Sequence, residues 1–187
     1  MGDDVPPAEI LASLRRMGLW DGVQVSGEAL AGGVSSDIWR IDLPSGPVCV
    51  KRALARLKVA ADWRAPVGRN RYEAAWMRAA DAAVPGATPA LLGQDEQAGA
   101  LAMQFLPAAS YKLWKAQLRD GHADPRFAES VGVRLGRIHA ATAADPSLAA
   151  AFPTDAIFYD IRLEPYLLAT AAVHPDRAAS LPQNAAP

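Results

Sequence analysis

The stretch Val48-Cys49-Val50-Lys51 ends a short apolar run with a lysine, and it follows the turn-forming residues Pro44-Ser45-Gly46-Pro47. Side chains alternate between the two faces of a strand, so the two valines share one face while Cys49 and Lys51 share the other. Apolar residues also alternate before the turn, and residues 37–52 are therefore predicted to form a β-hairpin. A lysine on a half-buried strand face favours a nearby carboxylate, because burying an unpaired charge is costly.

A nucleotide bound under this sheet would meet both residues of the polar strand face. Cys49 is small enough to lie against a flat adenine ring, and Lys51 is a compact cation suited to the oxygens of the α- and β-phosphates. Glu73, which lies 22 residues after Lys51, is the predicted counter-charge that orients the lysine. The alternative is an edge-strand lysine whose ammonium group lies in solvent.

Glu73 lies in a segment whose period changes from that of a strand to that of a helix. The helical pattern begins near Asn70 and ends at Pro85-Gly86. Four residues share one predicted face of this helix: Tyr72, Trp76, Ala79 and Ala83. We expect it to be the helix that crosses behind the sheet and brings Glu73 to Lys51.

A segment rich in glycine and serine, Gly32-Gly33-Val34-Ser35-Ser36, precedes the hairpin. Gly33 would permit close approach of the backbone to a ligand, and backbone N–H groups with the Ser35 or Ser36 hydroxyl would contact phosphate oxygens. Gly33 precedes Lys51 by 18 residues, about the length of one hairpin. The segment lacks the G-x-G-x-x-G spacing, so an ordinary hairpin turn is the alternative interpretation.

The segment from Leu101 to Pro107 is predicted to be an apolar strand that ends where the composition turns helical. In two-lobed nucleotide kinases a segment of this kind is the hinge that pairs with the adenine edge. On that interpretation Met103 lines the back of the pocket, Gln104 offers its carbonyl and Leu106 its N–H group. A buried strand before a loop is the alternative.

Helical patterns flank this strand-rich region. A short amphipathic helix is predicted at residues 8–17, and a weaker helical stretch covers Arg162 to Val173. After Asp124-Pro125, four apolar residues at helical spacing predict a buried stripe: Phe127, Val131, Leu135 and Ile138. The sequence thus predicts an α+β lobe at residues 1–106, and a linker with an incomplete helical lobe at 107–187.

The composition narrows the classes of partner. The chain has 187 residues, a formal net charge of −1 and one cysteine. A near-zero net charge gives no electrostatic basis for binding nucleic acid or an anionic membrane. A single cysteine forms no internal disulfide, and the acidic, proline-bearing N-terminus is unlike a signal peptide, so we expect a cytoplasmic protein.

These motifs, in this order, resemble the aminoglycoside phosphotransferase family, which includes choline and methylthioribose kinases. The resemblance covers roughly residues 25 to 178, and further matching segments are Leu135-Gly136-Arg137-Ile138-His139-Ala140 and Ile161-Arg162-Leu163-Glu164-Pro165-Tyr166-Leu167. It implies a protein-kinase-like fold, with an antiparallel sheet and one helix in the N-terminal lobe. It also implies ATP with Mg²⁺ as cofactor, and phosphorylation of a hydroxyl group on a small molecule whose identity stays open.

Two departures from the family pattern limit what this chain is expected to do. Gln104 stands where the family often has an acidic residue, although a backbone contact survives that change. The sequence contains no His-Gly-Asp, His-Arg-Asp or Asp-Phe-Gly motif, so the metal ligands are expected outside this chain. Metal and positioning supply most of the catalysis in phosphoryl transfer, so we expect nucleotide binding without turnover. The alternative is a non-catalytic, pseudokinase-like module that binds a nucleotide or a protein partner.

Overall fold

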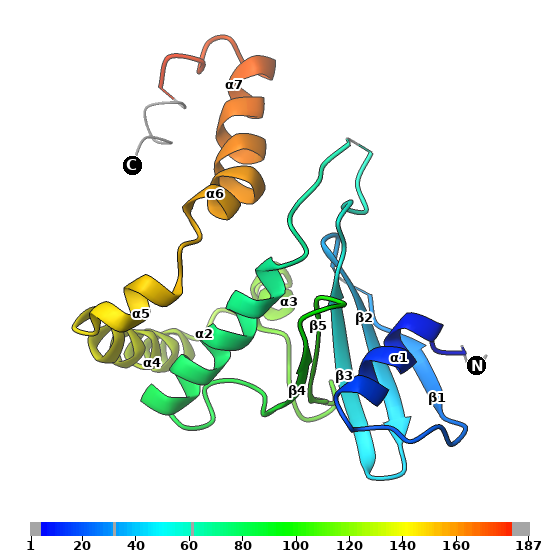
Figure 1. Ribbon diagram of the computed structural model, residues 1–187. Coiled ribbons are helices and arrows are strands. Elements are labelled where there is room, and N and C mark those ends of the chain that lie inside the picture. The colour runs from blue at the N-terminus through cyan, green and yellow to red at the C-terminus, as the bar shows by residue number, and fades with distance from the viewer. Residues whose placement is uncertain (1–4, 32, 61, 181–187) are drawn as a thin grey trace.

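The computed structural model describes residues 5–31, 33–60 and 62–180 and has an α+β architecture, with an antiparallel sheet and several helices (Figure 1). The five strands stand in the order β1-β2-β3-β5-β4. They are β1 (Ser26–Ala29), β2 (Ser36–Leu43), β3 (Gly46–Ala53), β4 (Leu91–Asp95) and β5 (Ala100–Gln104). The helices are α1 (Ala8–Arg16), α2 (Arg69–Ala83), α3 (Trp114–Arg119), α4 (Pro125–Ala143), α5 (Pro146–Ala151), α6 (Asp155–Phe158), the π-helix η1 (Tyr159–Leu168) and α7 (Ala169–Val173).

The hairpin predicted at residues 37–52 is confirmed as strands β2 and β3. Its turn contains Gly46 at φ +117°, a backbone conformation that residues with a Cβ atom rarely adopt. Lys51 stands opposite Ile38 on β2 and opposite Leu101 on β5, so it occupies the central strand of the sheet. The alternative of an edge-strand lysine is therefore excluded.

Helix α1 covers the valine face of this central strand. The buried residues between α1 and the sheet are Ile10, Leu14, Ile41, Leu43, Val48, Val50 and Ala102. Because side chains alternate along β3, burial of the two valines under α1 directs Cys49 and Lys51 to the opposite face. Helix α2 lies on the other side of the sheet from α1 (Figure 1).

The C-terminal end of α1 is fixed to the β4–β5 hairpin. Arg16 donates two hydrogen bonds to Asp95, at 2.9 Å from Nε and 2.6 Å from Nη2. Gly93 permits close approach here, since a Cβ atom at this position would lie 2.9 Å from the sulfur of Met17. The register of β4 against β5 also shifts between Leu91 and Gly93. These contacts hold α1 and β4 as one unit with the central strands.

The helix predicted from about Asn70 is confirmed as α2, although its buried face differs from the aromatic face seen in the sequence. The buried residues of α2 are Asn70, Ala74, Met77 and Ala80. Trp76 is 49% exposed, and the ring of Tyr72 lies 6.2 Å from that of Phe152, next to α5. Two of these four residues are alanines, Ala74 and Ala80, and both are fully buried.

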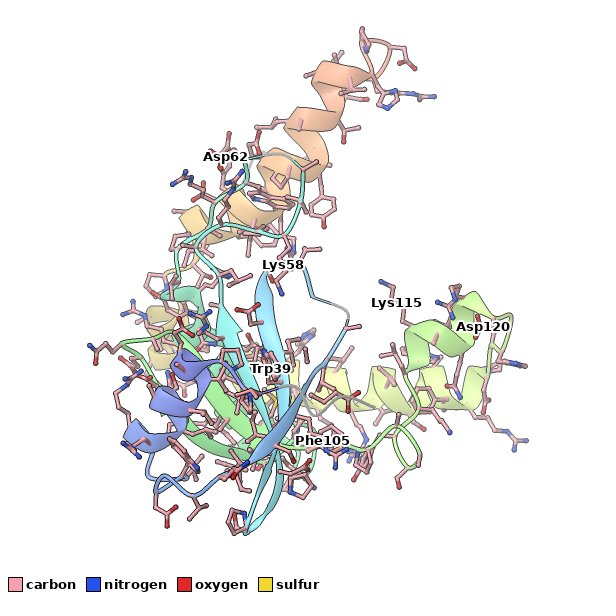
Figure 2. The ribbon with its side chains drawn as sticks, turned by 90° about the vertical axis from the view of Figure 1, so that its right-hand side faces the viewer. Trp39, Lys58, Asp62, Phe105, Lys115 and Asp120 are labelled. Atoms are coloured by element: carbon pink, nitrogen blue, oxygen red, sulfur yellow. The ribbon has the colours of Figure 1, made fainter. Side chains whose placement is uncertain are left out.

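The helix predicted after Asp124-Pro125 is confirmed as α4, but the prediction that its apolar stripe is buried is wrong. Only Ile138 is buried, where it packs against Ala80 and Val84 at the end of α2. Phe127 is 46% and Leu135 44% exposed. The reason is geometric: α3 and α4 extend to one side of the sheet (Figure 2), so α2 covers one end of the stripe only.

The weak helical stretch predicted from Arg162 is also confirmed, and it begins earlier, at Asp155. Pro165 lies inside it, where it lacks the N–H group that a regular helix needs, and the backbone there forms a π-helix. The indole Nε1 of Trp63 donates a 3.1 Å hydrogen bond to the carbonyl of Asp160. Within the described ranges, no helix is both long and apolar enough to cross a membrane.

Candidate functional site

The predicted pairing of Lys51 with Glu73 is present in the structure. The Lys51 Nζ atom lies 2.6 Å from Glu73 Oε1, and the two side chains are 25% and 37% exposed. Lys51 reaches α2 from the central strand, between Ile38 and Leu101 on the neighbouring strands. The pair is thus half-buried and firmly positioned, which gives a fixed ammonium group on the face of the sheet opposite α1.

Arg69 at the start of α2 joins the serine-rich segment to the loop that follows β3. Its Nη2 donates to the carbonyls of Ser35 at 2.5 Å and Leu54 at 3.0 Å. Its Nη1 donates to the carbonyls of Ala65 at 3.2 Å and Pro66 at 2.8 Å. Burial lowers the pKa of Arg69 and the Glu73 carboxylate opposes that shift, and an arginine stays protonated regardless.

The position of Arg69 in the sequence, at the start of a helix, is itself a signal that its side chain has distant partners. An arginine in the first turn of a helix is unfavourable, because the N-terminal end of the helix dipole is positive. A cation at that position therefore needs other partners. The four backbone carbonyls supply them, and they come from segments up to 34 residues away in sequence.

The serine-rich segment runs into the start of β2. Ser36 lies in β2 and is 5% exposed, while Ser35 precedes it and is half-buried. The carbonyl of Val34 accepts a 2.7 Å hydrogen bond from the backbone N–H of Lys58. A Cβ atom at Gly33 would meet Ile38 at an ordinary 3.4 Å, so the described surroundings do not require glycine there. Gly32 lies outside the described residues.

A cluster of charges holds the same end of β2 and β3. Asp37 accepts a hydrogen bond from Arg52 at 3.0 Å and forms an ion pair with Lys58 at 2.7 Å. Burial acts to raise the pKa of Asp37, but the hydrogen bonds from Lys58 and Arg52 outweigh it and keep that pKa below its ordinary value. Figure 2 shows Lys58 at this end of the sheet, below the loop that carries Asp62.

A cavity of about 250 Å³ adjoins the Lys51–Glu73 pair. Its walls come from β2, β3, α2 and the C-terminal helical segment. The lining residues are Ser35, Ser36, Lys51, Ala53, Arg69, Asn70, Tyr72, Glu73, Thr154, Ile157, Ile161 and Arg162. The predicted residues Ser35, Ser36, Lys51 and Glu73 are thus brought together around one space.

Asn70 is the unexpected member of this wall. It is 2% exposed, and neither its Oδ1 nor its Nδ2 atom has a hydrogen-bond partner among the described residues. A buried polar group without a partner costs about 1–3 kcal/mol, so proteins seldom keep one without a reason. No periodic pattern in the sequence singles out this residue.

The predicted adenine-side residues lie on the same sheet but apart from this cavity. Cys49 stands opposite Met103 across the β3–β5 ladder, so the two lie on the same face of the sheet as Lys51. Burial raises the pKa of the Cys49 thiol, with a smaller opposing effect from Lys51. Gln104 ends β5, and its backbone N–H donates to the carbonyl of Ala90 at 2.8 Å. Leu106 is half-buried in the segment that follows β5.

The described part of the chain holds no group of three or more His, Cys, Asp or Glu side chains able to bind a metal ion. Glu73, the carboxylate that lines the cavity, is already paired with Lys51. In comparisons with known proteins, no family model matches the sequence and no match is found among curated proteins.

Proposed function

We propose that residues 1–106 form the nucleotide-binding lobe of an ATP-dependent phosphotransferase with a protein-kinase-like fold, whose acceptor is a hydroxyl group on a small molecule. The observation that carries the proposal is the 2.6 Å pair of Lys51 and Glu73 between the central strand of an antiparallel sheet and helix α2. A lysine steadied by a carboxylate keeps its ammonium group in one position. Such a group neutralises phosphate oxygens without having to be reordered when the nucleotide binds.

The same face supports an adenine site next to the phosphate site. Cys49 lies two residues before Lys51 on the same strand face, which separates their Cα atoms by about 7 Å along a strand. Because burial raises the pKa of the Cys49 thiol, that side chain stays neutral and suits contact with an aromatic ring. In this proposal Met103 lines the back of the pocket, and Gln104 and Leu106 present backbone groups to the adenine edge.

The described residues support nucleotide binding better than they support phosphoryl transfer. Magnesium, when bound, would supply charge neutralisation for the phosphates, but the described residues offer no carboxylate cluster to hold it. We therefore assign no step through a metal, and we expect this polypeptide to bind ATP without transferring its phosphate. A non-catalytic nucleotide-binding module is the second candidate, and the exposed apolar side chains of α4, such as Leu135, favour one that also contacts a protein.

Calorimetric titration with ATP tests the proposal. Lys51→Ala should weaken ATP binding at least tenfold, because it removes a charge-assisted contact to phosphate. Lys112→Ala is the matched control, since Lys112 is exposed and does not line the Lys51 cavity. Equal ATP affinity of the two variants would refute the proposed role of Lys51. A turnover assay with candidate alcohols then separates the enzyme from the non-catalytic module.

A further inference from the structure

The cavity beside the Lys51–Glu73 pair has a size and a polarity that fit a small anion better than a whole nucleotide. Ligand pockets for whole small molecules occupy about 300–1,000 Å³, and this cavity occupies about 250 Å³. A water molecule takes about 30 Å³, so a group of several heavy atoms has room. Three cations and one carboxylate line the space: Lys51, Arg69, Arg162 and Glu73.

The three cations differ in what else they bind. Arg69 is committed to backbone carbonyls. Lys51 is paired with Glu73, yet an ammonium group has three donors and the pair uses one. Arg162 has no acidic partner among the described residues, and its one described hydrogen bond goes from Nη1 to the carbonyl of Ile161 at 2.8 Å. The guanidinium of Arg162 therefore keeps most of its donors for a ligand.

Asn70 provides a second, independent indication of a ligand. Its side chain lines the same cavity, is 2% exposed, and has no described partner at either amide atom. Both amide atoms are buried, so a small turn of the side chain toward the cavity would let a phosphate oxygen accept a hydrogen bond from Nδ2. Ser36, 5% exposed on the same wall, adds a hydroxyl donor.

We infer that this cavity binds the terminal phosphate groups of a nucleotide, with Arg162 as a second phosphate-binding cation opposite Lys51. The inference rests on the proposed nucleotide function and adds a residue from the helical segment to the site. Arg162 is suited to it because its planar guanidinium binds two oxygens of a phosphate at once, which an ammonium group does less well.

The segment that carries Arg162 is held in position from the other side by Trp63. The Trp63 indole donates to the carbonyl of Asp160, and its ring meets Tyr166 edge-on at 6.3 Å between centroids. The loop around Asp62 lies beside this helical segment (Figure 2). Trp63 is thus a positioning residue, which acts on phosphate binding through Arg162.

The test is calorimetric titration of the full chain with adenosine, ATP and inorganic pyrophosphate. Arg162→Ala should weaken the binding of ATP and pyrophosphate about tenfold, the loss expected for one charge-assisted contact, and leave adenosine unchanged. Arg162→Lys should recover part of the loss. Arg134→Ala is the control, because Arg134 is exposed on α4 and does not line the cavity. Trp63→Phe should weaken ATP several-fold with adenosine unchanged, a difference that general destabilisation would not produce.

The outcomes separate this inference from the proposed function. ATP binding that requires Lys51 but is the same in Arg162→Ala and Arg134→Ala would overturn the role of Arg162 and leave the nucleotide site standing. Binding of pyrophosphate that depends on Arg162, without any binding of ATP or adenosine, would uphold Arg162 as an anion-binding residue but overturn the nucleotide function, and with it the assignment of the cavity to a nucleotide's phosphates. Absence of binding by all three probes would overturn both.

Discussion

Replacing Arg69 by alanine should destabilise the fold strongly, because this one side chain joins three segments. Its guanidinium donates hydrogen bonds to the carbonyls of Ser35, Leu54, Ala65 and Pro66. A hydrogen bond to a charged group contributes about 1.5–3 kcal/mol, but such contributions are not additive when the bonds share one side chain. The bond to Pro66 is also solvent-exposed, which reduces its contribution.

Counting the three half-buried bonds at roughly 1 kcal/mol each, after that discount, gives a loss of about 3 kcal/mol in the free energy of unfolding. For a chain of this length, about 1 kcal/mol shifts Tm by about 2–4 °C, so Arg69→Ala should lower Tm by about 6–12 °C. Arg69→Lys should lose about half as much, because three donors on one nitrogen reach fewer carbonyls than the guanidinium fork.

Circular dichroism melts of three variants measure this effect. Arg71→Ala is the matched control: Arg71 lies on the same helix and is exposed, and its guanidinium donates a hydrogen bond to the neighbouring Tyr72 and, among the described residues, to no backbone carbonyl. Its Tm should stay within about 1 °C of the wild type, as for most surface substitutions. If Arg69→Ala melts within about 2 °C of Arg71→Ala, Arg69 is not the residue that joins these segments, and the reasoning from its four contacts is refuted.

Three further predictions concern the pair, the α1 contact and the exposed helix. Glu73→Gln should change the free energy of unfolding by less than about 1 kcal/mol, because the Lys51–Glu73 pair is partly exposed. The same substitution should weaken ATP binding, because Lys51 then loses the carboxylate that holds it in position. Unchanged ATP affinity in a titration would contradict this. Asp95→Asn should lower Tm at pH 7 and flatten its decline in acid. Burial acts to raise the pKa of Asp95, but hydrogen bonds, above all the one from Arg16, hold that pKa below its ordinary value. The carboxylate therefore stabilises the fold above about pH 4, and this stabilisation is lost as the pH falls through the lowered pKa. Parallel pH–Tm curves for the two proteins would refute that contribution. Leu135→Gln should reduce self-association in light scattering with little change in Tm, because Leu135 is 44% exposed; an unfolded variant would show that the residue is buried in solution.

The features predicted correctly from the sequence are those that depend on local period and on order along the chain. Alternation between Val48 and Lys51 predicted the strand and its two faces, and the change of period near Asn70 predicted the helix that carries Glu73. The lysine's need for a counter-charge then predicted which two side chains meet. The first two inferences use residues that are close in sequence, and the third uses a single long-range pair, Lys51 with Glu73.

The features that sequence analysis missed depend on several distant segments at once. Arg69 is held by four carbonyls from three stretches of the chain, at Ser35, at Leu54 and at Ala65-Pro66. Arg162 lines the cavity from a helical segment that contacts Trp63, about 100 residues away from it in sequence. The buried stripe predicted on α4 failed for a related reason. Helical spacing identifies an apolar face, but burial of Phe127 and its neighbours also requires an element to cover them, and spacing says nothing about that element.

The most direct test of the central claim is to locate the triphosphate of ATP on the chain by chemistry. An adenosine probe with a reactive acyl phosphate acylates the lysine nearest its phosphates, and mass spectrometry of peptides then identifies the modified residue. The structure predicts acylation of Lys51, strongly reduced by excess ATP, with modification of the exposed Lys112 and Lys115 insensitive to ATP. Acylation of Lys51 at the same level with and without ATP would contradict the account.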